Sequence, residues 1–432
     1  MTSPSTPIWI GEVELSLSLT PTGVSRAPHP DDSSARLLVR LHHQVLGFVT
    51  VPLVGDGLGV DAVWEAVRAQ LEEPLRRHLE ADGLAVPMSW PPGGVGGSDD
   101  CAATSPEGPE ALVSIVVCTR DRPVILATCL KLLQQLHYDN IEVLVVDNAP
   151  TTEETRLCFL ALVGDDPRFR YVREPVPGLS RARNRGLGEA RAQHVAFTDD
   201  DVRVDPWWLE AIQGGFARDP QAGCVTGLVP PAELDNAAQQ FFDRRYSWAA
   251  HLDTRVFDLA GRGDESPLYP FSAGIFGTGA NFAVDRELFA GLGGFDEALG
   301  AGSPAGGGED LDAFVRVLRA GRSLVYEPSA IVWHIHRADA RALRRQLFYY
   351  GVGLSAFLAK YMLDVRTARE IVSRIPEGLR RGSQMWNPAK IGGRAPKILI
   401  LAEAAGLVAG PFAYLRGRNR LRHRNFLGEN AI

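Results

Sequence analysis

Cysteine is scarce in this chain, and its spacing does not suit a metal site or a redox pair. Five cysteines are spread over 432 residues, and none stands in a CxxC pair. Their odd number and scattered positions argue against a disulfide framework and predict free thiols in a reducing cytosol. They are Cys101, Cys118, Cys129, Cys158 and Cys224.

The chain also lacks an excess of positive charge. Its formal net charge is -7, which argues against general nucleic-acid binding. The charge is uneven, because residues 340–432 hold 17 Lys/Arg against 5 Asp/Glu, a local +12. The composition, 45% hydrophobic and 22% charged over 432 residues, predicts a globular protein of two or three domains.

No segment has the features of a signal peptide or of a clear membrane span. The start, MTSPSTPIWIGEVELSLSL, has no basic region and alternates polar with apolar residues. Residues 398–415 form an apolar run with one charge, Glu403, and a helix-breaking Gly410-Pro411, and this run is short for a span of about 20 residues. Arginines follow at alternate positions from 416 to 424. Three alternatives stay open: attachment to an anionic membrane surface, docking against the rest of the protein, or a true span.

The first 110 residues divide into a module and a linker. Residues 1–90 predict a small α+β module, with strand-like alternation at 9–19 and 35–53 and a helix over 61–79 that Asp61 would cap. No catalytic motif is visible there. Residues 91–110 are rich in Pro, Gly, Ser and acidic residues, which predicts a flexible linker. Their Gly-Gly-Val-Gly-Gly has neither a strand before it nor a helix after it, so it is not a phosphate loop.

From residue 111 short apolar runs alternate with helical segments. Unbroken Val/Ile runs in such an alternation predict a parallel sheet with helices on both faces. The predicted strands are 112–118, 141–146, 169–172 and 194–197, and the predicted helices are 123–136, 151–163 and 180–192.

Polar residues follow three of these strands, at 119–121, 147–148 and 199–201. Because ligands of open α/β sheets bind outside the carboxyl ends of the strands, the three segments are expected on one rim. Asp199, Asp200 and Asp201 repel one another and are costly to bury unpaired, so they indicate either a Mg²⁺ or Mn²⁺ site or a solvated turn. Asp205 is expected only to cap the helix that begins at Pro206-Trp207.

Further chemistry lies in the later segments. The glycine-rich residues 302–308 lead into Glu309-Asp310, which predicts either a mobile loop that delivers a carboxylate or a simple loop and cap. A strand at 323–326 and a turn at 327–329 precede His334 and His336, which would share one strand face. Such a pair can bind zinc, but no further ligand is apparent nearby, so one histidine is expected to complete the aspartates' metal site.

The segments VSIVVCTRDRP, IEVLVVDNAP, GLSRARNRGLGEA, VAFTDDDV, GTGANFAVDRELF, GGGEDLDAFVRVLRAG and VWHIHR occur in the order found in family 2 glycosyltransferases. The resemblance covers residues 112–337. It implies the GT-A fold, a Rossmann-like, mostly parallel sheet with helices on both faces. The expected organisation is a module at 1–90, a linker at 91–110, a catalytic domain at 111–338, and a basic helical region at 339–432.

The resemblance also implies roles for individual residues. Asp310 would be the general base with Glu309 supporting it, and Asp199 with Asp201 would bind the metal, together with His336 or His334. The residues expected to contact the nucleotide sugar are Thr119, Arg120, Asp121, Asp147, Arg183, Asn184, Asp199 and Asp200. Thr119-Arg120-Asp121 departs from the usual Thr-Tyr-Asn, which leaves the identity of the base open.

These roles predict a metal-dependent inverting glycosyltransferase that moves one sugar from a nucleoside-diphosphate sugar to a hydroxyl acceptor, with Mn²⁺ or Mg²⁺ as cofactor. The acceptor would be a glycan, a lipid-linked molecule or a small molecule. No Gln-x-x-Arg-Trp motif of processive synthases occurs, which favours a single addition. The alternatives are a nucleotidyltransferase on a related fold and a catalytically silent nucleotide-sugar sensor or membrane scaffold. The expected location is the cytoplasm, with peripheral contact to the inner face of an anionic membrane.

Overall fold

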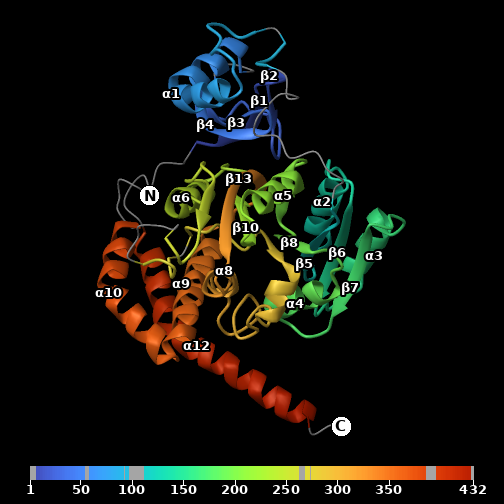
Figure 1. Cartoon of the computed structure of the whole chain (residues 1–432), viewed down its shortest axis with the longest axis vertical. Coiled ribbons are helices and arrows are strands. Elements are labelled where there is room, and N and C mark those ends of the chain that lie inside the picture. The colour runs from blue at the N-terminus through green and yellow to red at the C-terminus, as the bar shows by residue number, and fades with distance from the viewer. Residues whose placement is uncertain are drawn as a thin grey trace.

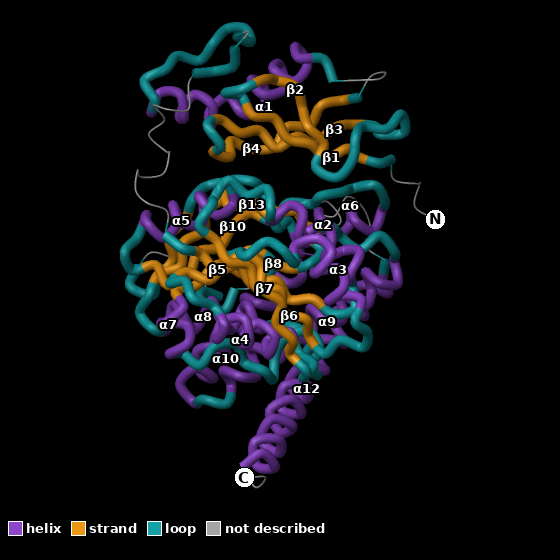
Figure 2. The backbone as a smooth tube through the Cα atoms, turned by 90° about the vertical axis from the view of Figure 1, so that its right-hand side faces the viewer, coloured by secondary structure: helices purple, strands orange, loops and turns teal. Residues whose placement is uncertain are grey.

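The structure is a computed structural model that describes residues 6–53, 58–91, 93–96, 111–261, 268–272, 274–385 and 396–429. A small N-terminal module sits at one end of a central α/β domain, and a long C-terminal helix projects from the opposite end (Figure 1). A view turned by 90° shows the same arrangement (Figure 2). The four cysteines in the described part of the chain are free thiols.

The N-terminal module is α+β, as its alternation predicted. Its strands are β1 (Ile8–Glu14), β2 (Ser18–Gly23), β3 (Ser34–Leu41) and β4 (Gln44–Pro52), in the sheet order β2-β1-β3-β4, and its helix is α1 (Val60–Ala81). The expected cap at Asp61 is wrong, because α1 begins at Val60 after Gly59. Val95 is buried and its N–H donates to Leu15, so the module extends into the predicted linker. Residues 97–110 of that linker lie outside the described residues.

The central sheet has the order β11-β13-β10-β12-β8-β5-β6-β7, and β9 pairs with β13. Its half from β8 to β7 is parallel, as the alternation of apolar runs and helices predicted, whereas β12 runs antiparallel to both β8 and β10. The strands are β5 (Val113–Thr119), β6 (Ile141–Asn148), β7 (Phe169–Glu174), β8 (His194–Asp199), β9 (Val202–Val204), β10 (Ala222–Leu228), β11 (Arg255–Phe257), β12 (Asn281–Asp285) and β13 (Ser323–His334).

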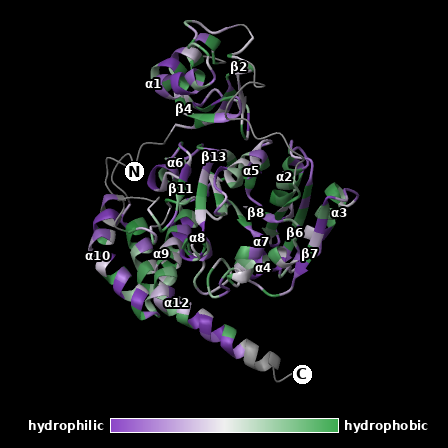
Figure 3. Ribbon diagram, viewed as in Figure 1, coloured by the Kyte–Doolittle hydropathy of each residue, from purple (hydrophilic) through white to green (hydrophobic). Residues whose placement is uncertain are grey.

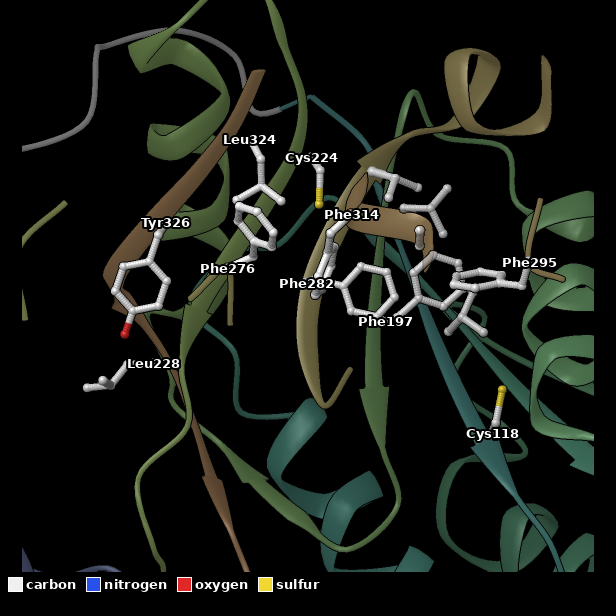
Figure 4. Packing of buried hydrophobic residues seen from close by; sticks show 14 of the residues in the cluster. Cys118, Phe197, Cys224, Leu228, Phe276, Phe282, Phe295, Phe314, Leu324 and Tyr326 are labelled. Carbon is white, nitrogen blue, oxygen red and sulfur yellow. The ribbon is translucent and has the colours of Figure 1, made fainter. Parts of the chain in front are cut away.

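Helices cover both faces of this sheet. One apolar core lies under α4, α7 and α8, and the other lies under α2, α3 and α5. Figure 4 shows the first core, where Phe197, Phe282, Phe295 and Phe314 pack edge to face and in stacks. The helices are α2 (Pro123–Leu133), α3 (Glu154–Val163), α4 (Leu179–Glu189), α5 (Trp208–Arg218), α6 (Ala237–Tyr246), α7 (Arg286–Gly291) and α8 (Glu309–Arg319).

Strand β13 is continuous over residues 323–334, so the turn expected at 327–329 is wrong. The pairing with β10 moves from Gly227 opposite Glu327 to Leu228 opposite Ile331. The chain therefore passes Pro328 in a β-bulge, which accommodates a residue that cannot donate to the ladder.

In the described part of the C-terminal region the helices are α9 (Ala340–Met362), α10 (Val365–Met385) and α12 (Lys397–Glu429). α12 crosses α9 closely, because Gly406 and Gly410 lie against the α9 backbone, where a Cβ on Gly406 would be 2.0 Å from the carbonyl oxygen of Phe348. The break expected at Gly410-Pro411 is wrong, since α12 runs through Pro411. A proline removes one helical hydrogen bond, and here it directly follows Gly410, which packs on α9.

The module contacts the central domain at several points, which include the ion pair of Arg26 with Asp235 and that of Arg36 with Asp243. The hairpin of β3 and β4 adds further contacts. Arg40 at the end of β3 makes a buried ion pair with Asp205, and His43 stacks on Trp207 with ring centroids 3.9 Å apart. Asp205 does accept from the N–H of Trp207 at 2.9 Å, but the expectation that it only caps a helix is wrong. Its second oxygen holds the module.

Candidate active site

The sheet register brings the three predicted polar segments to one rim. β5 lies between β8 and β6, with Cys118 opposite Asp199 and Thr119 opposite Asp147. All three strands run in the same direction, so their carboxyl ends carry residues 119–121, 147–148 and 199–201 at the same edge. The predicted position of these three segments on one rim of the sheet is therefore confirmed.

A group of potential metal ligands forms at this rim. Asp199, Asp201 and His334 each offer one ligand atom, and these atoms all lie within 4.8 Å of one another. The pairing of β9 with β13 places His334 opposite Val202, which brings it beside Asp201, at 3.7 Å from Nε2 to Oδ1. Two carboxylates and an imidazole are a donor set that Mn²⁺ or Mg²⁺ accepts.

The protonation states at this cluster are set by burial and by charge. Burial lowers the pKa of His334, against the effect of Asp201. Burial raises the pKa of Asp199 to about 6, against the pull of Arg183. Burial also opposes ionisation of Asp201, but His334 and nearby arginines outweigh it and lower the pKa of that carboxyl.

His336 lies behind His334 rather than in the cluster. The Nδ1 atoms of the two rings are 3.3 Å apart, and the ring of His336 packs edge-on against Phe242 with centroids 4.6 Å apart. Of the two histidines left open by the sequence, His334 is the one that the fold brings to Asp199 and Asp201.

Asp200 faces a different set of partners from its two neighbours. It accepts from the hydroxyl of Thr119 at 2.7 Å and from Arg122 at 2.5 Å, and burial raises its pKa to about 7. Arg122 also reaches Asp201 at 2.9 Å, and Arg337 lies 3.4 Å from the same oxygen. Both arginines lie in segments quoted for the resemblance, VSIVVCTRDRP and VWHIHR, but sequence reasoning assigned neither of them a role.

Arg183 joins the rim to the second acidic site. Its guanidinium donates to Glu309 at 3.0 Å and to Asp199 at 3.3 Å, and also to the carbonyl of Gly279 at 2.8 Å. The side chain is only 2% exposed and lies over the rings of Phe282 and Phe295. Arg183 was predicted to line the nucleotide pocket. In the structure it is buried and pairs with both Asp199 and Glu309.

The Glu309-Asp310 pair begins helix α8. Asp310 accepts from the N–H of Gly279 at 2.9 Å and from that of Leu311 at 2.9 Å, so its carboxylate is held in place. Burial, together with the charge of Asp310, raises the pKa of Glu309 to about 7 against the effect of Arg183. Gly308, in the left-handed region at φ 86°, packs on Gly353 of α9. The predicted mobility of this loop stays a prediction.

The nucleotide-side residues occupy several environments. Asp147 is buried and accepts from the Tyr171 hydroxyl at 2.6 Å, while its Oδ1 has no hydrogen-bond partner among the described residues. Burial raises its pKa. Asp121, in the left-handed region, accepts from the N–H and hydroxyl of Thr151, and exposed Arg120 lies 3.9 Å from it.

Both amide atoms of Asn184 are hydrogen-bonded to the backbone of Phe295. Its nitrogen donates to the carbonyl of Phe295 at 2.9 Å, and its oxygen accepts from the N–H of Phe295 at 2.7 Å. This pair of bonds ties α4 to the segment after α7. The predicted nucleotide contact of Asn184 stays untested, and in this conformation the residue serves to position that segment.

Known proteins resemble the chain over this same region. The family model described as Glycosyl transferase family 2 matches residues 114–289. A pre-mycofactocin glycosyltransferase of Mycobacterium tuberculosis is 34% identical over 175 residues, which are 40% of this chain and 34% of that protein. The chain thus spans about a third of the length of this relative.

Two further similarities extend beyond that region. A glucosyl-dolichyl phosphate glucuronosyltransferase of Haloferax volcanii is 25% identical over 227 residues, covering 51% of this chain and 68% of that one. A solved structure, the mannosyltransferase PcManGT from Pyrobaculum calidifontis in complex with GDP-Man and Mn2+, has a TM-score of 0.43 and 20% identity over 74% of this chain and 79% of its own. Residues 114–289, which form much of the α/β domain and carry the strand-end acidic rim, are therefore similar to glycosyl transferase family 2.

Proposed function

We propose that the protein is a metal-dependent, inverting glycosyltransferase that adds one sugar from a nucleoside-diphosphate sugar to a hydroxyl acceptor. The observation that carries this proposal is the buried Arg183, which contacts Asp199 on the rim and Glu309 beside the second acid. One acidic group suits the leaving diphosphate and the other suits the attacking hydroxyl. The arginine fixes the distance between them.

The leaving-group side would consist of Asp199, Asp201 and His334. These residues would hold Mn²⁺ or Mg²⁺, which supplies Lewis-acid stabilisation of the departing diphosphate. Arg122 and Arg337 flank Asp201, and both side chains are partly exposed, at 31% and 46%. Their positive charge would offset the charge that the diphosphate oxygens gain as the glycosidic bond breaks.

The nucleotide side would use the unpartnered oxygen of Asp147. A buried acceptor without a donor carries a desolvation cost, which an N–H or O–H of the base or ribose would remove. Thr119, Arg120 and Asp121 line the same rim. The hydroxyl of Thr119 is already bonded to Asp200, so its contact with a nucleotide would be through the backbone or apolar atoms.

The attack side would use Asp310 as general base. The acceptor oxygen forms its bond to the sugar carbon while the bond to the diphosphate breaks, and the hydroxyl proton passes to the Asp310 carboxylate. Because the carboxylate attacks no carbon itself, a single displacement inverts the configuration. A catalytically silent sensor would not need a positioned base. The hydrogen bond from the N–H of Gly279, which positions the Asp310 carboxylate, therefore favours an enzyme.

The proposal is tested by nucleotide release from a panel of nucleotide sugars with Mn²⁺, with Mg²⁺ and with EDTA. Asp310→Asn is expected to keep donor binding, read by thermal shift, and to lose about 10²- to 10⁴-fold in turnover, the usual contribution of a general base. Asp166→Asn, before β7 at the opposite end of the strands, is the matched control and should keep full turnover. Near-normal turnover in Asp310→Asn would remove that residue from the base role, and activity unchanged by EDTA would remove the metal.

We further propose peripheral attachment to the inner face of an anionic membrane through α12. Residues 397–423 are long and apolar enough to cross a membrane by length and composition, yet this helix packs on α9, and Glu403 pairs with the buried Arg245 at 2.8 Å. Its outward face exposes Ile398, Leu401, Val408 and Phe412 by 53% to 73%. Figure 3 shows the polar character of the helix beyond this stretch, where arginines from position 416 onward would meet lipid headgroups.

A groove of about 440 Å³ supports a membrane-linked acceptor near this helix. It lies between the loop at 302–304 and α12, whose Phe412, Arg416 and Arg420 line it. The same loop leads to Asp310, so an amphipathic acceptor with an anionic group would reach the base from here.

Flotation with liposomes of anionic and of neutral lipids tests the attachment. Val408→Ser/Phe412→Ser should reduce binding to anionic vesicles, while Leu157→Ser, a residue 60% exposed on α3, should leave it unchanged. Absence of binding by the full chain would overturn attachment without touching the transfer reaction.

A further inference from the structure

Two histidines and an aspartate converge inside the N-terminal module, where the sequence shows no catalytic motif. His42 Nδ1 lies 3.1 Å from His78 Nε2 and 3.0 Å from Asp82 Oδ2, and His78 Nε2 lies 3.3 Å from the same oxygen. The side chains are 0%, 12% and 4% exposed. Three ligand atoms thus form one small triangle in a nearly buried place.

The fold brings these residues together from a turn and a helix end. His42 and His43 form the two-residue connection between β3 and β4, with φ values of 52° and 65°. Such a turn favours Asn-Gly, and histidine at these positions is uncommon. Glu14 stabilises the turn by accepting from both N–H groups at 3.0 Å.

The other two ligands are one helical turn apart at the C-terminal end of α1. His78 and Asp82 have the i, i+4 spacing that places side chains on one face. Asp82 is the C-cap of the helix. The helix therefore presents an imidazole and a carboxylate together toward the turn.

The outer contacts favour the protonation state that a metal requires. His42 Nε2 lies 3.3 Å from the carbonyl oxygen of Val95, which keeps the ring proton on Nε2 and leaves a lone pair on Nδ1. Metal-binding histidines usually donate their second ring N–H in this way.

We propose that His42 Nδ1, His78 Nε2 and Asp82 Oδ2 bind a divalent transition-metal ion, zinc foremost, at a site separate from the acidic rim. With zinc–ligand distances of about 2.0–2.1 Å, two ligands of a tetrahedral site lie about 3.3 Å apart, close to the three separations found here. Two imidazoles and one carboxylate suit zinc better than Mg²⁺. The fourth position would be filled by water.

The ion would fix the β3–β4 hairpin, which is one of the elements through which the module docks. His43, the second residue of the turn, stacks on Trp207, and Arg40 in the same hairpin pairs with Asp205. Closing His42 onto α1 would therefore hold both docking contacts in place. The role is structural, and it is independent of the transfer reaction.

A zinc-binding measurement on the full chain tests this site. The chain should carry no polyhistidine tag and should have Asp199→Asn/Asp201→Asn as background, so that the rim does not take zinc. After chelation, reloading with zinc and dialysis, mass spectrometry of the metal content should find about one zinc per chain. Zinc added to the chelated protein should raise the melting temperature by several degrees, as for any ligand of the native state.

Variants of the ligands decide between a metal site and a hydrogen-bonded triad. His78→Gln and His42→Asn, which tolerates the left-handed turn, should each lose the bound zinc and the zinc-dependent shift. His29→Ala, an exposed histidine of the same module, should lose neither. Co²⁺ should give tetrahedral visible absorption in the background protein but not in His78→Gln. No zinc in the folded background protein, or equal zinc in folded His78→Gln and Asp82→Asn, would overturn the proposal.

Discussion

Two clusters in the described part of this protein each bring three potential metal ligands together, and they differ in the number of carboxylates and imidazoles. The rim cluster has two carboxylates and one imidazole, whereas the module cluster has two imidazoles and one carboxylate. Carboxylate oxygens suit Mg²⁺ and Mn²⁺, and imidazole nitrogens suit zinc. In the proposed roles, the first donor set would hold a diphosphate-binding ion and the second would hold a structural ion.

The surroundings of the two clusters differ in the same sense. At the rim, Arg122 and Arg337 contact Asp201, and Asp199 is itself 31% exposed, which suits a site that admits an anionic substrate. In the module, His42 is fully buried, and its second nitrogen faces a backbone carbonyl. A buried cluster held by the backbone suits an ion that stays in place.

Asp201→Asn should produce the largest effect, because it removes a charged ligand from the rim. Loss of several kcal/mol of leaving-group stabilisation would lower metal-dependent turnover by about a thousandfold. Asp200→Asn is the matched control, since that side chain faces Thr119 and Arg122, and its turnover should fall far less. Both are measured as nucleotide release at saturating Mn²⁺. Equal losses of turnover in the two variants would contradict the assignment of Asp201, and not Asp200, as a metal ligand.

Arg40→Leu should act on stability instead. It leaves Asp205 buried without its cation, which typically costs about 3–5 kcal/mol. Urea unfolding should show this loss, and turnover well below the unfolding transition should fall much less than in Asp201→Asn. In Arg40→Leu/Asp205→Asn the orphaned charge is gone, so part of the stability should return. A double variant no more stable than the single one would show that the charge is not the cause.

Glu309→Gln should alter the dependence of stability on pH. Burial raises the pKa of Glu309 from 4.5 to about 7, so the folded state keeps a proton that the unfolded state releases between these values. Its contribution is present below pH 4.5 and is lost as the pH rises toward 7, at up to about 1.4 kcal/mol per pH unit. In EDTA, urea unfolding from pH 5 to 8 should show a shallower fall in the variant. An unchanged slope would place the titration elsewhere.

The rim could be predicted from the sequence because the signals that mark it lie in short, continuous segments of the chain. Unbroken apolar runs ending in polar residues mark parallel strands, and the carboxyl ends of such strands share an edge. The antiparallel β12 was not predicted, because Asn281–Asp285 follows a glycine-rich segment and is too short to show a pattern. The position of His334 rather than His336 depends on pairing between β9 and β13, which no local signal encodes.

The contacts that depend on tertiary packing could not be predicted from the sequence. Arg183 lies in a helix sequence of ordinary polarity, and only packing shows that it is buried between two acidic sites. The module cluster joins residues 36 and 40 positions apart through a turn with left-handed backbone, and histidine is not a residue that predicts such a turn. Neither pattern has a spacing that a sequence would disclose.

His43→Asn should have the smallest effect and separates the turn's two functions. Asparagine tolerates the left-handed backbone, so the hairpin and the neighbouring His42 are kept while the stack on Trp207 is lost. An aromatic pair contributes about 0.5–1.5 kcal/mol, and the melting temperature should fall by a few degrees. Zinc content should stay that of the parent protein, because His43 is not a ligand. Loss of zinc together with the stack would show that docking on the central domain holds the cluster together. The proposal that the ion holds the hairpin in its docked position would then be wrong.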